Sequence, residues 1–250
     1  MKFATVADNG ARIGYVELAG REPVRLFIHG LGSSALAYFT SIAADPLLFG
    51  SRSLLVDLLG FGISDRPQDY DYTIDRQAES LARLLDGLRL SNVDVIAHSM
   101  GGSIAVALAA SRPDLVGRLV LCEPSLKPTS RLRVEAYTER EFIEEGFATA
   151  LASVGDIWPA TMRIADPVAM YRSEHSLGKN MPLDLCERLL GLTMPRLIII
   201  GARTPEPHCL DQIRAAGLPI VTIADAGHNM MLDNHAAFVA ALQDFLLKKS

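Results

Sequence analysis

The chain has 250 residues, of which 49% are hydrophobic and 21% charged, and its formal net charge is −5. This is an ordinary balance for a globular protein, with enough apolar residues for one large α/β domain or two small ones. Lysine and arginine are scattered and form no dense basic block, which argues against a nucleic-acid-binding protein.

The three cysteines are Cys122, Cys186 and Cys209, and no CxxC spacing occurs. This pattern argues against a disulfide framework and against a zinc site, so we expect neither a metal nor a cofactor. No apolar run follows a basic N-terminal region, and no apolar stretch approaches about 20 residues. We therefore expect a cytoplasmic protein with no secretory signal and no membrane span.

Short apolar runs rich in β-branched residues recur along the chain. They predict strands at residues 12–18, 24–28, 53–56, 93–97, 118–122, 197–200 and 219–223. Continuous apolar runs of this kind are typical of strands buried on both faces of a parallel sheet. Helical patterns lie between them at residues 74–88, 100–110 and 234–247, and Thr73 is a candidate cap for the first. The alternation predicts an α/β fold with a mostly parallel central sheet and flanking helices.

Residues 124–193 break this rhythm, because they contain helical patterns and no clear buried strand. An insertion of this length between two sheet strands indicates a helical cap over a site. We expect residues 1–123 and 194–250 to form the core and residues 124–193 to form the cap. The alternative is a small independent helical subdomain.

The stretch Ala97-His98-Ser99-Met100-Gly101 joins a predicted strand to a predicted helix. A nucleophilic serine on a strained strand-to-helix turn needs small residues two positions away on either side, and Ala97 and Gly101 meet that need. We predict Ser99 as the nucleophile. The side chain of His98 is expected to point away from the pocket.

The strand at 24–28 ends in His29-Gly30-Leu31-Gly32. Such a loop turns sharply and can aim backbone N–H groups at a carbonyl oxygen that becomes negative during acyl transfer. We assign the N–H groups of Leu31 and Met100 to this oxyanion hole, and we expect His29 to hold the loop.

His228 follows the last predicted strand on a short loop and comes after Ser99, as the order nucleophile, acid, histidine requires. We predict it as the general base that takes the Ser99 proton.

Four motifs in this order resemble those of the α/β-hydrolase superfamily: residues 29–32, 57–65, 97–102 and 225–228. The resemblance implies a serine hydrolase, with the esterases as the nearest type. In most such enzymes the acid follows the strand here at 197–200, but this sequence has Thr204 in that turn. Two carboxylates remain as candidates, Glu123 and Glu206.

Glu123 is favoured because it ends the strand that follows the nucleophile strand, and because a glutamate between a buried strand and a proline is costly unless paired. Its position resembles the relocated acid of some haloalkane dehalogenases. Those enzymes use an aspartate nucleophile, so Ser99 does not imply dehalogenation.

We expect cleavage of an ester-type bond in a small to medium apolar acyl substrate through an acyl-enzyme, with Phe142 and Trp158 of the cap lining the pocket. Carbon–carbon, lactone and thioester hydrolysis use the same machinery, and a cofactor-free haloperoxidase-like activity is a further alternative. A non-catalytic ligand receptor on a hydrolase fold is an alternative from another class. The oligomeric state stays open.

Overall fold

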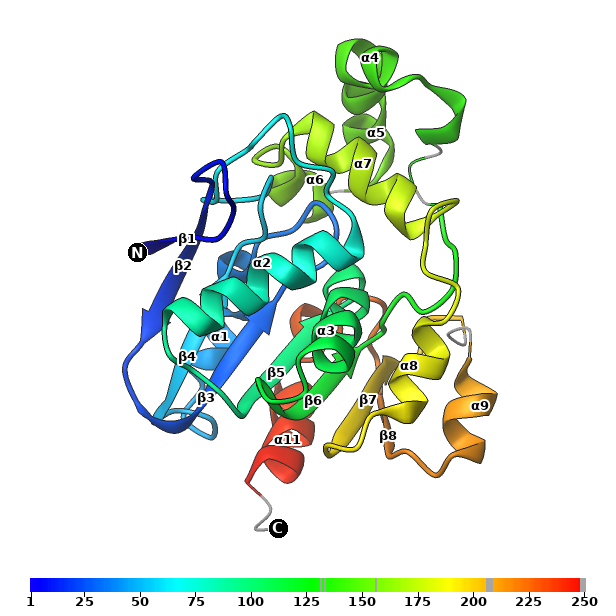
Figure 1. Ribbon diagram of the computed structural model, residues 1–250. Helices are drawn as coiled ribbons and strands as arrows, with labels where there is room; N and C mark the ends of the chain where they lie inside the picture. The colour runs from blue at the N-terminus through cyan, green and yellow to red at the C-terminus, as the bar shows by residue number, and fades with distance from the viewer. Residues whose placement is uncertain (131, 133, 156, 206–208, 248–250) are drawn as a thin grey trace.

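The computed structural model describes residues 1–130, 132, 134–155, 157–205 and 209–247 (Figure 1). Within these residues, eight strands form one sheet in the order β1-β2-β4-β3-β5-β6-β7-β8. Neighbouring strands from β4 to β8 are parallel, whereas β1 and β2 run antiparallel to their neighbours. The strands are β1 (Lys2–Thr5), β2 (Arg12–Leu18), β3 (Arg21–Ile28), β4 (Ser51–Val56), β5 (Val93–His98), β6 (Val116–Cys122), β7 (Arg196–Gly201) and β8 (Ile220–Ile223).

The mostly parallel sheet expected from the sequence is confirmed, and each expected strand is present. The structure adds β1 at the antiparallel edge of the sheet. Most of its side chains are exposed, so it lacks the continuous apolar run that marks a buried strand. The structure also starts β3 three residues earlier than the sequence pattern predicted. These residues, Arg21 to Pro23, are exposed and do not belong to the apolar run.

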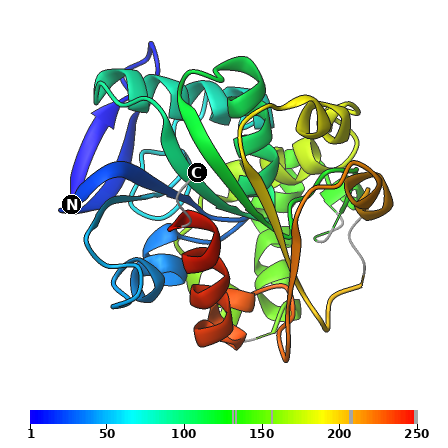
Figure 2. The same ribbon diagram turned by 90° about the horizontal axis from the view of Figure 1, so that it is seen from below.

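Helices cover both faces of the sheet, as the view from below in Figure 2 shows. On β3, Leu26 and Ile28 pack into one hydrophobic core while Phe27 packs into the other, as the pleat of a strand requires. The first core is completed by α2 (Ile74–Gly87), α3 (Met100–Ser111), α8 (Leu185–Gly191) and α9 (Leu210–Ala215), and the second by α1 (Ala35–Ala43), α10 (Met230–Asp233) and α11 (His235–Leu246).

The three helices expected from periodicity are present as α2, α3 and α11. Thr73 caps α2 as expected, since its side chain accepts a hydrogen bond from the N–H of Arg76. Helix α3 is buried on nearly all sides. A Cβ at Gly102 would lie 2.7 Å from a side-chain carbon of Pro124, so a glycine lets α3 lie close to the end of β6.

A helical insertion connects β6 to β7, as the sequence predicted. Its elements are the 3₁₀ turn η1 (Val134–Ala136), α4 (Glu139–Glu141), the π-helical turn η2 (Phe142–Gly146), α5 (Phe147–Ser153), α6 (Ile157–Met162), α7 (Pro167–Leu177) and α8. Figure 1 shows α4, α5, α6 and α7 gathered beyond one end of the sheet, whereas α8 lies beside α3. Among the described residues, no helix is long and apolar enough to cross a membrane.

Candidate active site

Ser99 lies at the sharp turn between β5 and α3. Its backbone has φ 53° and ψ −119°, a conformation that residues with a side chain rarely adopt. A Cβ at position 101 would lie 2.5 Å from the carbonyl oxygen of His29, so only glycine fits there. The small residue that the sequence motif required at this position is therefore explained by the close approach of the neighbouring strand.

His228 lies on the loop between β8 and α10 and contacts Ser99. Its Nε2 lies 3.1 Å from Oγ of Ser99, and its Nδ1 lies 2.6 Å from Oε2 of Glu123. An ionised carboxylate only accepts hydrogen bonds, so Nδ1 carries the proton and Nε2 is left to accept the hydroxyl of Ser99. The contact with Glu123 thus selects the tautomer that a general base needs.

Glu123 directly follows β6 and is 5% exposed. Its Oε1 accepts a hydrogen bond of 2.8 Å from the N–H of Gly201, at the end of β7. Burial raises the pKa of the Glu123 carboxyl, but the hydrogen bonds from His228 and Gly201 outweigh burial and bring this pKa below its usual value. The carboxylate is therefore ionised at neutral pH and fixed at both oxygens.

Thr204 stands where the resemblance places the acid. Its buried hydroxyl helps to lower the pKa of Glu123, although the two groups do not reach normal hydrogen-bond geometry. Glu206, the other acid candidate, lies outside the described residues.

His98 was expected to point away from the pocket, and that expectation is wrong. Its side chain lines the cavity, with its ring centroid 4.6 Å from that of His228. Nε2 of His98 donates a hydrogen bond of 2.8 Å to the carbonyl oxygen of His228, because that oxygen can only accept. Alternation along β5 places His98 on the same face as Ile96, which packs into the core completed by α1, α10 and α11, so its ring lies beside Tyr38 of α1 and the loop that carries His228.

The loop after β3 is held by His29, which is fully buried. Its Nδ1 donates to the carbonyl oxygen of Gly30 at 2.7 Å, and its Nε2 accepts the N–H of Leu58 at 3.0 Å. Burial lowers the pKa of His29, so the ring is neutral. The Gly30 carbonyl and the Leu31 N–H belong to one planar peptide group and point in opposite directions, so anchoring the carbonyl also fixes the Leu31 N–H.

Two cap side chains contact the same loop from the other side. The indole Nε1 of Trp158 donates to the carbonyl oxygen of Leu31 at 2.8 Å, and the hydroxyl of Thr161 donates to that of Gly32 at 2.9 Å. Gly32 has φ +62°, and a Cβ there would lie 2.7 Å from the Trp158 nitrogen. The helical insertion therefore packs directly on the loop that carries Leu31.

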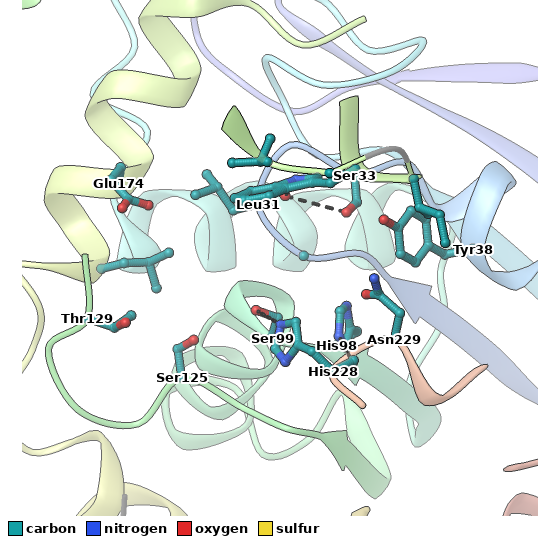
Figure 3. A pocket seen from close by; sticks show the side chains of 16 residues that line it. Leu31, Ser33, Tyr38, His98, Ser99, Ser125, Thr129, Glu174, His228 and Asn229 are labelled. Atoms are coloured by element: carbon teal, nitrogen blue, oxygen red, sulfur yellow. Dashed lines mark hydrogen bonds between the residues drawn. The ribbon is translucent and has the colours of Figure 1, made fainter. Parts of the chain in front are cut away.

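These elements surround a cavity of about 320 Å³ that contains Ser99 and His228 (Figure 3). Its apolar wall consists of Leu31, Val154, Ile157, Trp158 and Leu177. Its polar side chains, besides the two histidines and Ser99, are Ser33, Tyr38, Ser125, Thr129, Glu174 and Asn229. The cavity thus has an apolar wall and hydrogen-bonding groups on both sides of Ser99.

The structure places the predicted site residues in two groups. Leu31, Trp158, Ser99 and His228 line the cavity. Glu123 contacts His228 without lining the cavity, and Met100 is the first residue of α3, directly after Ser99. Phe142 is fully buried inside the cap, and its ring packs against those of Tyr137, Phe147 and Tyr171 rather than lining the described cavity.

The sequence reasoning did not find Tyr38, Thr129 or Glu174. They come from α1, the start of the insertion and α7, and none belongs to a local motif. Asn229 had a usable signal, since it adjoins His228 in the chain. Among the described residues, no group of three or more histidine, cysteine or acidic side chains is arranged to hold a metal ion.

Two hydrolases resemble this chain in sequence over limited segments. A 2-hydroxymuconate semialdehyde hydrolase of Pseudomonas sp. (strain CF600) is 39% identical over 97 residues, which are 38% of this chain and 34% of that enzyme. A 2-hydroxy-6-oxo-2,4-heptadienoate hydrolase of Pseudomonas putida is 32% identical over 117 residues, 46% of this chain and 42% of that enzyme. These matches span less than half of the relatives' length.

Solved structures resemble the chain over nearly its whole length. A bromoperoxidase from Bacillus anthracis superposes with a TM-score of 0.82 at 19% identity, and 99% of each chain is covered. An esterase from Exiguobacterium antarcticum has a TM-score of 0.80 at 20% identity, with 98% of this chain and 99% of that chain covered. At such identities the likeness concerns the fold.

A family model described as alpha/beta hydrolase fold matches residues 23–206. The matched segment contains the strained turn at Ser99, the loop after β3, and β6 with Glu123 directly after it. The family match covers most of the chain and agrees with the observed sheet order, so the chain belongs to the α/β hydrolase fold family, as a hydrolase with a helical insertion.

Proposed function

We propose that this hydrolase cleaves a carboxylic ester of a small to medium acyl group through a covalent acyl-enzyme. The observation that carries the proposal is the unbroken hydrogen-bond chain from Ser99 through His228 to Glu123. The Ser99 end of this chain lies in a cavity whose wall is partly apolar.

In acylation, Oγ of Ser99 attacks the ester carbonyl carbon while Nε2 of His228 takes the hydroxyl proton. The imidazolium that forms is stabilised by the Glu123 carboxylate 2.6 Å from Nδ1. The carbonyl oxygen becomes negative and accepts hydrogen bonds from the N–H groups of Leu31 and Met100. His228 then gives the proton to the leaving alkoxide, and the alcohol departs.

In deacylation, a water molecule takes the place of the alcohol. His228 removes a proton from this water as its oxygen attacks the acyl carbon. The proton then returns to Oγ of Ser99, and the carboxylic acid is released. Because both halves use the same two hydrogen bonds of His228, a change at Glu123 slows both.

A carbon–carbon hydrolase is the second candidate. It is favoured by the sequence similarity to the 2-hydroxymuconate semialdehyde hydrolase and the 2-hydroxy-6-oxo-2,4-heptadienoate hydrolase. A heptadienoate is a carboxylate anion, and such a substrate needs a cationic or strongly donating partner in the cavity. The described lining contains no lysine or arginine, which supports the ester reading.

The test begins with a fluorophosphonate probe, which labels activated serines. We expect labelling at Ser99, detected by mass spectrometry of the modified peptide, and none in the Ser99→Ala variant. A panel of 4-nitrophenyl esters of rising acyl length then gives kcat/KM, beside a 2-hydroxy-6-oxo-dienoate as the carbon–carbon substrate. No labelling would favour a ligand receptor, and faster turnover of the dienoate than of every ester would favour the second candidate.

A further inference from the structure

Tyr38 brings a hydroxyl group to the wall of the cavity. This residue lies on α1, is 2% exposed, and belongs to the hydrophobic core that α1, α10 and α11 complete. The hydroxyl of a buried tyrosine usually has a hydrogen-bond partner inside the protein. Among the described residues no group bonds to the Tyr38 hydroxyl, and its oxygen is not sealed from solvent. The hydroxyl is therefore open to the cavity that Tyr38 lines.

Asn229 is a second polar side chain on this wall. It occupies the N-cap position of α10 and is half-buried. An asparagine at such a position ordinarily caps its helix, because its side-chain oxygen accepts a backbone N–H. Here the side chain makes no capping bond, and it is the backbone carbonyl that accepts the N–H groups of Leu232 and Asp233. The amide is directed toward the cavity instead, as Figure 3 shows.

The position of His228 indicates which part of a substrate meets these two side chains. In the proposed ester reaction His228 protonates the leaving alkoxide, so the alcohol part lies on the side of its ring. The ring of His98 follows at a centroid distance of 4.6 Å, and the ring of Tyr38 stacks on His98 at 6.2 Å. Figure 3 shows Tyr38 and Asn229 on this side of Ser99 and α7 on the opposite side. The two polar side chains therefore face the alcohol part of the ester.

The chemistry of this side favours a neutral polar group. A phenol hydroxyl and a side-chain amide can each donate and accept hydrogen bonds, so a substrate hydroxyl can bond to either. An alkyl chain that displaces water from the same place leaves both groups without a partner, and sites of this kind reject substrates that lack the matching polar group. The described lining contains no lysine or arginine to balance an anion.

We propose that Tyr38 and Asn229 form an alcohol subsite, which selects esters whose alcohol part carries a further hydroxyl group. This inference rests on the proposed function, because the direction of the substrate follows from the ester reaction. It names the leaving-group class of that site, namely diols and other hydroxylated alcohols.

The test compares two acetate esters of matched length, 4-hydroxybutyl acetate and pentyl acetate. Both form the same acetyl-enzyme, so a difference in kcat/KM arises from the alcohol part. Release of acetic acid is followed by titration at constant pH. We expect wild type to prefer the hydroxyl-ended ester about fivefold or more, which is the size of effect that one or two net hydrogen bonds give.

Two variants remove the proposed partners one at a time. Tyr38→Phe removes the hydroxyl and keeps the ring that stacks on His98, and Asn229→Ala removes the amide. Each should narrow the preference for the hydroxyl-ended ester about threefold or more. The matched control is Tyr137→Phe, which removes the hydroxyl of a half-buried tyrosine that does not line the described cavity. This control should keep the wild-type preference.

The inference is overturned if wild type cleaves pentyl acetate as well as the hydroxyl-ended ester, or if either Tyr38→Phe or Asn229→Ala keeps the wild-type preference. Either result removes the subsite and leaves the proposed function in place, since the esters are still cleaved.

Binding of the two esters to Ser99→Ala, measured by ligand-observed NMR, tests the subsite without turnover. If wild type cleaves neither ester but Ser99→Ala binds the hydroxyl-ended one more tightly, and a further Tyr38→Phe change removes that difference, the proposed function fails and the subsite stands. Equal binding of the two esters contradicts the subsite.

Discussion

Replacing Glu123 with glutamine removes one charge from the hydrogen-bond chain and leaves its shape. The N–H of Gly201 already donates to Oε1 of Glu123, so the amide oxygen of glutamine takes that place and its NH₂ group turns toward His228. The NH₂ group can only donate, which forces Nδ1 of His228 to accept and moves the ring proton to Nε2. In that tautomer His228 cannot take the proton of Ser99.

The magnitude follows from the tautomer and from the lost charge 2.6 Å from Nδ1. Losing the correct tautomer and the partner of the imidazolium lowers kcat by about 10³- to 10⁴-fold in serine hydrolases of this design. That range corresponds to about 4–5.5 kcal/mol of transition-state stabilisation. Steady-state hydrolysis of a 4-nitrophenyl ester by Glu123→Gln measures it, with a thermal melt to verify folding.

The control for this experiment restores a carboxylate at the usual position. Thr204 lies close enough to Glu123 to influence its pKa, so we expect an aspartate at this position to reach the same histidine. We expect Glu123→Ala/Thr204→Asp to recover about tenfold or more of the activity that Glu123→Ala loses. A folded Glu123→Gln variant with activity within about tenfold of wild type would refute the reasoning, and Glu206→Gln would then be the next variant to measure.

Three further predictions concern the surroundings of the triad. Trp158→Phe removes the hydrogen bond to the Leu31 carbonyl, and Thr161→Val removes the one to the Gly32 carbonyl. Each variant should lower kcat for ester hydrolysis about 10-fold with little change in KM. A change in KM alone would contradict this prediction. Gly101→Ala places a Cβ 2.5 Å from the His29 carbonyl oxygen and should lower the free energy of unfolding by about 2 kcal/mol or more, measured in urea; an unchanged midpoint would show that the turn yields easily. Burial lowers the pKa of His29, so as the pH falls the unfolded chain binds a proton at His29 before the folded chain does. The free energy of unfolding should therefore fall as the pH drops below about 6.5. A His29→Gln variant whose free energy of unfolding depends on pH as steeply as that of wild type would contradict the role of His29.

Local patterns predicted much of the fold and the sharp strand-to-helix turn at Ser99. The apolar runs gave the parallel strands because a strand buried on both faces needs apolar residues at every position. Ser99 was predictable because its turn needs small neighbours, and the contact between position 101 and His29 is the steric reason. The exposed edge strand β1 gave no such signal, since few of its side chains are buried.

The lining of the cavity could not be predicted in the same way. Phe142 and Trp158 are both aromatic residues of the cap, yet Trp158 lines the cavity while Phe142 packs against other cap rings. Composition shows that both are apolar, but only the packing of α6 and α7 on the loop after β3 decides which one meets the substrate. The orientation of His98 has the same origin, because alternation places it with Ile96 on the face covered by α1, α10 and α11, and only the fold brings the loop of His228 to that face.

The position of Glu123 shows what chain order contributes to a site. Adjacent parallel strands end at the same edge of a sheet, and the order β5-β6-β7 brings Ser99, Glu123 and Gly201 to neighbouring strand ends. A carboxylate after either β6 or β7 can therefore reach a histidine that lies over this edge. With Thr204 after β7, the longer side chain of Glu123 crosses from β6, and the Gly201 N–H at the end of β7 holds its second oxygen. The sheet fixes where an acid is needed, and more than one strand end can supply it.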